Sequence, residues 1–434
     1  MDADRAYGVR IDPATRAALM PARRYHQWAM AIFNPFLPSF TRSPYRAYAA
    51  LRAEEPVHFS PTLQAWVVTS YAECERILRD HARFSSSPLH ATGPVAEMIR
   101  QQRRELPLGA VPTVLNSDPP VHTRLRGIVS TAFTPRVVEG LRARIVAIAE
   151  SLLDEVPEHG EFDLVPTLMQ PLPVIVIAEL LGVPPEDRAL FKQWSNAIAA
   201  TTNLFPTADT FAAVKQATTE LIAYLTTFVE ARQREPQDDL LTALVQAEDA
   251  GGRLSRAELL AFCVLLLVAG HETTTNLIGN GVLALLGAPE GAEALDALRA
   301  DPALIPNAVE EFLRYDSPVQ AIPRVATEQV TLGEGAEART IEPGAFVLLL
   351  IGAANRDPAR FPEPDRFDIR REDVRHLSFG LGSHFCLGAP LARLEAHVVF
   401  EVLLRRFPSL QSGGEPERGG TFVLRGLQRL PVSG

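Results

Sequence analysis

HLSFGLGSHFCLGAPLARLE, residues 376–395, is the most informative stretch of the chain because it places one cysteine, Cys386, within a glycine-rich turn. Gly380, Gly382 and Gly388 surround the cysteine, and glycine permits backbone conformations and close approaches that other residues resist. An apolar helical pattern begins directly after the cysteine, and N–H groups at a helix N-terminus favour a thiolate over a thiol. The stretch therefore predicts a loop that presents one thiolate as a single metal ligand to a planar cofactor.

Two other interpretations of this cysteine are simpler. A lone cysteine is most often a buried free thiol. A tetrahedral zinc site would need partners at CxxC or HxxxH spacing, which His384 and Cys386 lack. The spacing F-G-x-G-x-H-x-C-x-G is more specific, and it resembles the haem-binding loop of the cytochrome P450 family. The resemblance implies that Cys386 is the axial thiolate ligand of haem iron, and that Phe379 and Gly380 also contact the haem.

Composition sets the broad class. The 434 residues exceed the usual size of a single core, so we expect two or three domains or one large fold. The net charge of −10 argues against a nucleic-acid partner. Three widely spaced cysteines predict no disulfide framework, and the N-terminal residues show no signal-peptide pattern, so we expect a cytoplasmic location. The longest apolar run, Leu259–Gly270, is too short to span a membrane, which predicts a buried core helix and no stable membrane insertion.

Residues 118–136, DPPVHTRLRGIVSTAFTPR, predict a helix that starts near the prolines. His122 and Arg126 are four residues apart and share one face of this helix. A solvated basic face is the ordinary interpretation of such a pair. The D-P-P-x-H-T-x-x-R pattern resembles the P450 helix that holds a haem propionate, which implies that His122 and Arg126 bind this carboxylate. By the same resemblance, Arg324 and His384 are the third and fourth partners.

The stretch from Leu254 to Leu286 predicts one long helix, with VAGHETTT in its middle. A buried carboxylate such as Glu272 costs free energy unless it is paired or hydrated. The Thr273 hydroxyl can bond back to the carbonyl of Ala269, loosen the helix and leave room for a water beside Gly270. A Thr-rich segment that merely packs is the ordinary alternative. A-G-x-[DE]-T-T resembles the oxygen-activating segment of the family, which implies that Glu272 and Thr273 relay protons and that Ala269 and Gly270 contact the haem.

A structural cluster is predicted near residues 305–315. Glu311 and Arg314 are three residues apart on a helix, which favours an ion pair. Such a motif occurs often by chance, and at a surface it contributes little. Together with Arg366 it resembles the Glu–Arg–Arg triad of P450 proteins, so we assign these three residues to structure.

The predicted fold is the cytochrome P450 fold: mainly α with a small β region, a long central helix crossing the haem, and the cysteine loop on the opposite face. Residues 1–43 are interpreted as an N-terminal extension and residues 44–434 as a single haem domain. Within that domain, β structure is expected near 56–69, 316–352 and 420–428. Residues 84–113 are expected to be irregular.

The resemblance also implies a function. It predicts a monomeric haem-thiolate monooxygenase that binds haem b, uses O2, and hydroxylates or epoxidises a hydrophobic molecule such as a fatty acid, terpenoid, steroid or polyketide. Electrons would come from NAD(P)H through a reductase and a ferredoxin, which we expect to dock on the Cys386 side, with Arg124 and Arg136 as candidate contacts. A peroxide-driven peroxygenase is one alternative, although such relatives typically lack the Glu272–Thr273 pair. A non-catalytic partner protein is another, although such proteins lose the cysteine.

Overall fold

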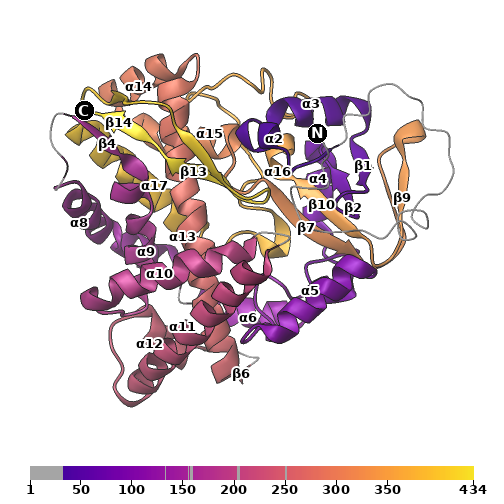
Figure 1. Cartoon of the computed structure of the whole chain (residues 1–434), viewed down its shortest axis with the longest axis horizontal. Coiled ribbons are helices and arrows are strands. Elements are labelled where there is room, and N and C mark those ends of the chain that lie inside the picture. The colour runs from indigo at the N-terminus through magenta and orange to yellow at the C-terminus, as the bar shows by residue number, and fades with distance from the viewer. Residues whose placement is uncertain (1–32, 132, 155, 157–159, 203–205, 250–251) are drawn as a thin grey trace. The chain divides into compact units, whose positions relative to one another are not determined.

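The computed structural model describes residues 33–434 except 132, 155, 157–159, 203–205 and 250–251. Helix α13, Arg256–Gly287, runs through the middle of this part of the chain (Figure 1). A capping box fixes its first turn, because the Ser255 hydroxyl accepts the N–H of Glu258 while the Glu258 carboxylate accepts the N–H of Ser255. By length and composition α13 resembles a membrane span. Its packing partners show instead that it is a core helix, as predicted: α9 (Pro171–Leu180), α11 (Ala208–Arg234), α15 (Ile305–Tyr315) and α17 (Ala389–Arg406).

The other α-helices of the described residues surround this centre, and α17 begins three residues after Cys386. Their bounds are α2 (Pro38–Arg42), α3 (Tyr45–Glu54), α4 (Tyr71–Arg79), α5 (Pro94–Glu105), α6 (Val121–Ser130), α7 (Pro135–Gly140), α8 (Arg142–Leu153), α10 (Arg188–Ala199), α12 (Leu240–Gln246), α14 (Gly291–Ala300) and α16 (Ile351–Ala354).

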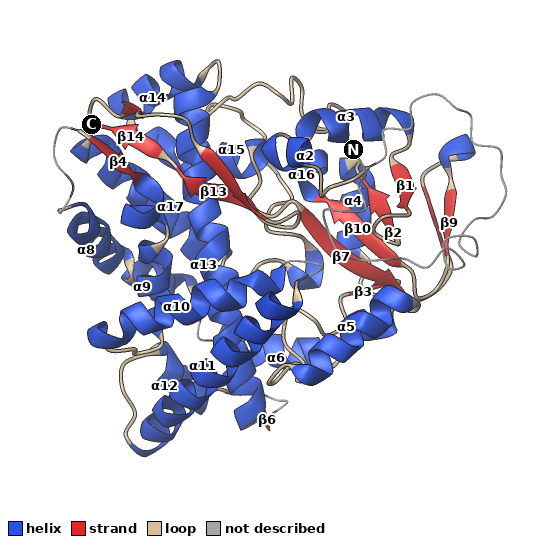
Figure 2. Cartoon of the chain, viewed as in Figure 1, coloured by secondary structure: helices blue, strands red, loops and turns tan. Residues whose placement is uncertain are grey.

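One five-stranded sheet joins segments that are far apart in the sequence. Its order is β1 (Val57–Ser60), β2 (Ala65–Val68), β10 (Phe346–Leu350), β7 (Ala321–Ala326) and β3 (Phe84–Ser85), with β10 parallel to β2 and antiparallel to β7. Figure 2 shows this sheet on the side of the fold away from α8–α12. Strand β7 carries Arg324, which pairs in register with Val347, so the sheet fixes the position of a predicted site residue.

Some of the smaller strand pairs lie in the predicted β regions, whereas the strands at 161–163, 248–249, 252–253, 411–412 and 431–433 lie outside them. The smaller pairs are β8 (Val330–Leu332) with β9 (Arg339–Ile341), β12 (Glu417–Gly420) with β13 (Arg425–Arg429), β14 (Pro431–Ser433) between β11 (Gln411–Ser412) and β4 (Glu161–Asp163), and β5 (Glu248–Asp249) with β6 (Gly252–Arg253). The predicted fold class, mainly α with a small β region, is confirmed.

Two expectations about local structure need correction. Residues 84–113 are not wholly irregular, because α5 occupies Pro94–Glu105 after Gly93, whose φ of +89° suits glycine. Residues 33–43, assigned to the extension, pack in the same compact unit as the rest of the described chain. There, Arg425 donates hydrogen bonds to the carbonyls of Thr41 and Arg42.

Candidate active site

The Cys386 loop is held by its own backbone. The Cys386 N–H donates to the carbonyl of Phe379 at 2.9 Å, which closes the turn around the 3-10 segment η8, Gly382–His384. Gly380 and Gly382 have φ values of +66° and +71°, as the sequence pattern predicted for this turn. A Cβ on Gly382 would lie 2.7 Å from the carbonyl oxygen of Leu78, so this glycine also permits close packing on α4.

Opposing effects act on the Cys386 thiol. Burial raises the pKa of Cys386 above its ordinary value, and the N–H groups of Gly388 and Ala389 and the charges of Arg126 and Arg393 offset this rise only in part. The donors at the start of α17 therefore point at the sulfur, as the glycine-rich pattern predicted. Coordination of a metal ion would deprotonate such a thiol outright.

Four basic side chains from α6, β7 and η8 meet next to this loop: His122, Arg126, Arg324 and His384. The rings of His122 and His384 lie 4.0 Å apart between centroids, and the Nε2 atom of each is buried without a hydrogen-bond partner among the described residues. Burial, with smaller effects from His122 and Arg324, lowers the pKa of His384 to about 4. The sequence placed His122 and Arg126 on one helix face, and the structure brings all four residues together.

Among the residues that the structure describes, the two arginines of this group donate hydrogen bonds to backbone carbonyls only. Arg126 donates to the carbonyl of Phe385 at 2.7 Å, and Arg324 donates to the carbonyl of Pro323 at 2.8 Å. Burial lowers the pKa of Arg324 to about 10, and the nearby Asp118 offsets this effect only in part. Asp118 itself accepts hydrogen bonds from Ser85 and from the N–H of Ser86. The group thus combines two guanidinium groups with two imidazoles, and Arg324 and His122 are its buried members.

The middle of α13 has the predicted local geometry at its threonine. The Thr273 hydroxyl donates to the carbonyl of Ala269 at 2.6 Å, and Ala269 itself is exposed in the middle of this core helix. Burial raises the pKa of Glu272 to about 7, and its Oε2 atom is buried with no hydrogen-bond partner in the described part of the chain. His271 faces another way, with Nδ1 2.8 Å from the hydroxyl of Ser195 on α10.

Gly270 has a packing role that the sequence did not indicate. A Cβ at this position would lie 2.6 Å from Cδ1 of Ile177 on α9, so the glycine allows α9 and α13 to approach closely. The assignment of Gly270 as a haem contact stays a prediction.

Comparison with known proteins identifies the family. The family model "Cytochrome P450" matches residues 109–420. The polyketide biosynthesis cytochrome P450 PksS of Bacillus subtilis is 40% identical over 93% of this chain and 98% of that protein, and its solved structure matches with a TM-score of 0.82 over 92% and 99% of the two chains. The cytochrome P450 monooxygenase PikC of Streptomyces venezuelae is 43% identical over 91% of both chains. The vitamin D(3) 25-hydroxylase of Pseudonocardia autotrophica is also 43% identical, over 92% of this chain and 96% of that protein.

The chain belongs to the cytochrome P450 family. It is therefore an oxidoreductase of the haem-thiolate monooxygenase class that uses haem and O2.

The residues present fit a haem. Haem carries carboxylates along one edge, and these need cationic or hydrogen-bond donor partners when they are buried. The unpartnered Nε2 atoms of His122 and His384 and the buried guanidinium of Arg324 supply such partners. The thiol of Cys386 is of the kind that would supply a metal ligand, and the exposed Ala269 leaves space for a flat group beside α13.

The ion pair between Glu311 and Arg314 is a buried structural feature of this P450. Both side chains are fully buried and their closest atoms are 2.7 Å apart. The side chain of Arg366, which was assigned with them to structure, does not reach Glu311: it is half exposed and lies 3.5 Å from Glu363. Arg371 lies instead with Nε 3.4 Å from Oε2 of Glu311. Arg366 takes part through its carbonyl oxygen, which accepts a hydrogen bond from Arg314 at 3.1 Å.

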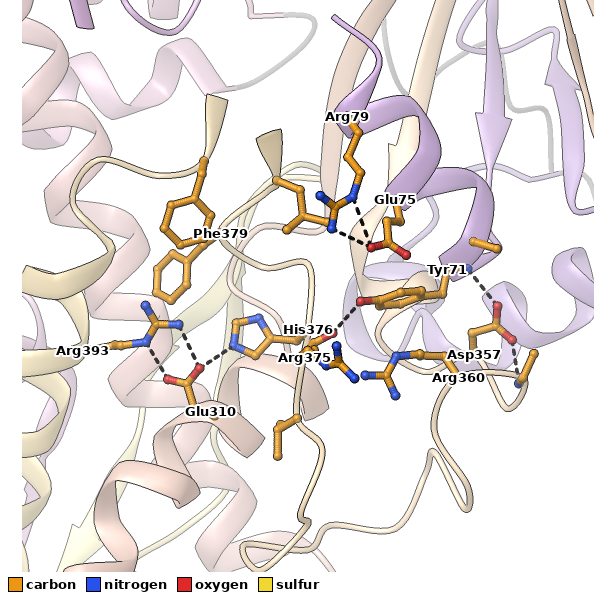
Figure 3. Close-up of a pocket in the computed structure, with 15 residues that line it drawn as sticks. Tyr71, Glu75, Arg79, Glu310, Asp357, Arg360, Arg375, His376, Phe379 and Arg393 are labelled. Carbon is orange, nitrogen blue, oxygen red and sulfur yellow. Dashed lines mark hydrogen bonds and ion pairs between the residues drawn. The ribbon is translucent and has the colours of Figure 1, made fainter. Parts of the chain in front are cut away.

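A surface concavity of about 600 Å³ lies beside the cysteine loop (Figure 3). It is bordered by residues that sequence reasoning did not select, from α4, α15, α17 and the segment before the cysteine: Tyr71, Glu75, Arg79, Glu310, Arg360, Arg375, His376 and Arg393. Phe379 and the exposed Phe385 complete its lining. Arg124, predicted as a docking residue, is not part of this lining, and its guanidinium pairs with Glu258.

Proposed function

We propose that Cys386 is the axial thiolate ligand of haem iron, with His122, Arg126, Arg324 and His384 as the partners of the haem carboxylates. The convergence of buried, unpartnered nitrogen donors beside a single cysteine loop is the observation that carries this proposal. When bound, the haem supplies oxygen activation and substrate oxidation. The chain contributes the ligand, neutralises the carboxylates and limits access of water.

Glu272 and Thr273 are proposed to supply protons. A group transfers protons efficiently when its pKa lies near the operating pH, and burial raises that of Glu272 to about 7. The Thr273 hydroxyl donates its hydrogen bond to the Ala269 carbonyl, so the lone pairs of the hydroxyl oxygen are free to accept a hydrogen bond from water. Glu272 is thus the proton store, and Thr273 orients the water that carries the proton onward.

The proposed substrate is a hydrophobic molecule of moderate size, for hydroxylation or epoxidation. Apolar residues that we expect to contact it come from separate elements, and Val319 and Leu424 are brought together by an antiparallel bridge. On the central helix, Leu265 and Leu266 are partly buried. PksS is named for polyketide biosynthesis, and the 25-hydroxylase is named for vitamin D(3). The two relatives have similar sequence identity to this chain. These names favour a polyketide or a steroid-like molecule over a small polar one.

The electron donor is proposed to be a ferredoxin, supplied by a reductase and NAD(P)H, that docks at the concavity beside the cysteine loop. The exposed Phe385 is the neighbour of Cys386 in the chain, which gives a short path to the sulfur. Arg375, whose largely exposed side chain pairs with Asp373, is one of the arginines of the lining that would attract an acidic partner. These residues replace Arg124 as the proposed contacts of the ferredoxin. Arg136 is exposed on α7 and stays a proposed contact.

The test of the proposed function is oxygen incorporation. The haem-loaded protein would be supplied with a surrogate ferredoxin, its reductase, NADPH and ¹⁸O2, together with a panel of polyketide and steroid substrates. We expect products that gain one ¹⁸O atom. Products formed only with hydrogen peroxide would indicate the peroxygenase alternative. Haem binding without turnover of any kind would indicate a non-catalytic partner protein.

A further inference from the structure

Glu310 on α15 is a carboxylate that binds two groups of the cysteine region at once. Its Oε1 and Oε2 atoms accept hydrogen bonds from Arg393 at 2.6 and 2.9 Å, and Oε2 lies 3.3 Å from Nε2 of His376 (Figure 3). Burial raises the pKa of Glu310, but the hydrogen bonds from Arg393 and the imidazole of His376 close by outweigh burial and lower it to about 2. Glu310 is therefore ionised at every pH at which the protein is used.

Its two partners both contact the ring of Phe379. The Arg393 guanidinium lies over this ring at 4.5 Å from the centroid, and the His376 ring lies 5.8 Å away. The N–H of Ser378 donates to Nδ1 of His376 at 3.1 Å, which assigns the remaining ring proton to Nε2, on the side of Glu310. The Glu310 carboxylate thus contacts two side chains, Arg393 and His376, that both contact the ring of Phe379.

Phe379 connects this cluster to the cysteine. Its carbonyl oxygen accepts the N–H of Cys386 at 2.9 Å, so the position of Phe379 and the shape of the cysteine loop are linked. Arg393 also acts on the sulfur through its charge, which favours the thiolate. The negative charge of Glu310 balances the positive charge of Arg393 and also determines where the Arg393 guanidinium lies.

We propose that Glu310 is a positioning residue that, through Arg393 and His376, holds Phe379 against the Cys386 loop and sets the reduction potential of the bound haem iron. This inference rests on the proposed role of Cys386 as the axial ligand. Electron density donated by the sulfur stabilises ferric iron. Without Glu310, the unbalanced charge of Arg393 draws electron density toward the sulfur and away from iron, so the reduction potential rises.

The same concavity provides a matched control. Glu75 is also a carboxylate on its lining, but it pairs with Arg79 on α4 at 3.0 Å. Figure 3 shows Glu75 and Arg79 apart from Phe379. Glu75→Gln therefore removes the same charge from the same concavity without releasing Arg393.

The experiment is a spectroelectrochemical titration of the haem-loaded wild-type protein and of the Glu310→Gln, Glu310→Asp and Glu75→Gln variants. For Glu310→Gln we expect the ferric–ferrous equilibrium to shift toward the ferrous form by about threefold or more, equivalent to about 28 mV for one electron. Glu310→Asp, which keeps the charge on a shorter side chain, should shift the potential in the same direction by less. Glu75→Gln should leave the potential at the wild-type value.

Two results would overturn the inference while the proposed function stands. The first is a red-shifted band of the reduced carbon monoxide complex in all proteins together with an unchanged potential in both Glu310 variants. The second is an equal shift in Glu310→Gln and Glu75→Gln, which would mean that charge acts without positioning. A wild-type protein that lacks the red-shifted band would overturn Cys386 as the ligand, and the inference with it. If Glu310→Gln does not fold, the comparison of Glu310→Asp with Glu75→Gln decides between these results.

Discussion

Arg324 provides a prediction in which one substitution has opposite effects on the haem-free and the haem-bound protein. Its guanidinium is buried and donates to a neighbouring carbonyl, while Asp118 compensates its charge only in part. The pKa of Arg324 falls from 12.5 to about 10. At about 1.36 kcal/mol for each pH unit, this difference corresponds to about 3 kcal/mol of unfavourable free energy for the buried charge at pH 7.

Replacing Arg324 with methionine keeps most of the apolar side chain and removes the charge. We expect Arg324→Met to stabilise the haem-free protein by about 1–3 kcal/mol, since the full electrostatic cost is an upper bound. We expect the same change to weaken haem binding by about 3–5 kcal/mol, because a buried carboxylate loses its cationic partner. Urea unfolding of the haem-free protein and the rate of haem transfer to excess apomyoglobin measure the two effects.

Arg366→Met is the matched control, because the Arg366 side chain is half exposed and pairs with Glu363 at 3.5 Å. A change of about 0–1 kcal/mol in either assay is expected for this variant. The reasoning is refuted if Arg324→Met destabilises the haem-free protein, or if haem leaves Arg324→Met and Arg366→Met at the same rate.

Three further predictions concern proton supply and stability. The free energy of unfolding of the haem-free protein should fall as pH rises from about 4.5 to about 7, because Glu272 keeps its proton to a higher pH in the folded protein than in the unfolded chain. Urea unfolding at a series of pH values should show a smaller fall in Glu272→Gln. Thr273→Ala should keep haem but divert electrons from product, and a ratio of product to NADPH consumed equal to that of the wild type would contradict its role. Glu311→Leu should lower the free energy of unfolding, measured in urea, by about 3–5 kcal/mol because Arg314 stays buried without its carboxylate partner. The control Glu363→Leu should lower it by less than about 1 kcal/mol. Equal losses in the two variants would contradict the importance of the buried ion pair.

The sequence was most informative where spacing along one element determines geometry. The four-residue interval between His122 and Arg126 placed both on one face of α6, and the apolar pattern around VAGHETTT predicted α13. The hydrogen bond from Thr273 to the carbonyl of Ala269 is a local helix property, so it too was predictable. Local spacing therefore accounts for these helices and for the placement of these residues on them, whereas the fold as a whole was predicted from the family resemblance.

Features formed by several elements were not predictable in this way. Glu310 and Arg393 are 83 residues apart and lie on different helices, so no pattern links them. Arg366 and Arg371 occupy one irregular, proline-rich segment without periodicity, and only the path of the chain decides which guanidinium reaches Glu311. Helix α5 could have been predicted from the sequence. Gly93 and Pro94 precede a run of good helix formers, and proline is common in the first turn of a helix.

The measurement that tests the central claim most directly is the optical spectrum of the purified protein, reduced and exposed to carbon monoxide. Thiolate ligation by Cys386 predicts a strongly red-shifted Soret band that is lost in Cys386→Ser. A Soret band at the position typical of histidine or thiol ligation, or a red-shifted band that persists in Cys386→Ser, would contradict the account.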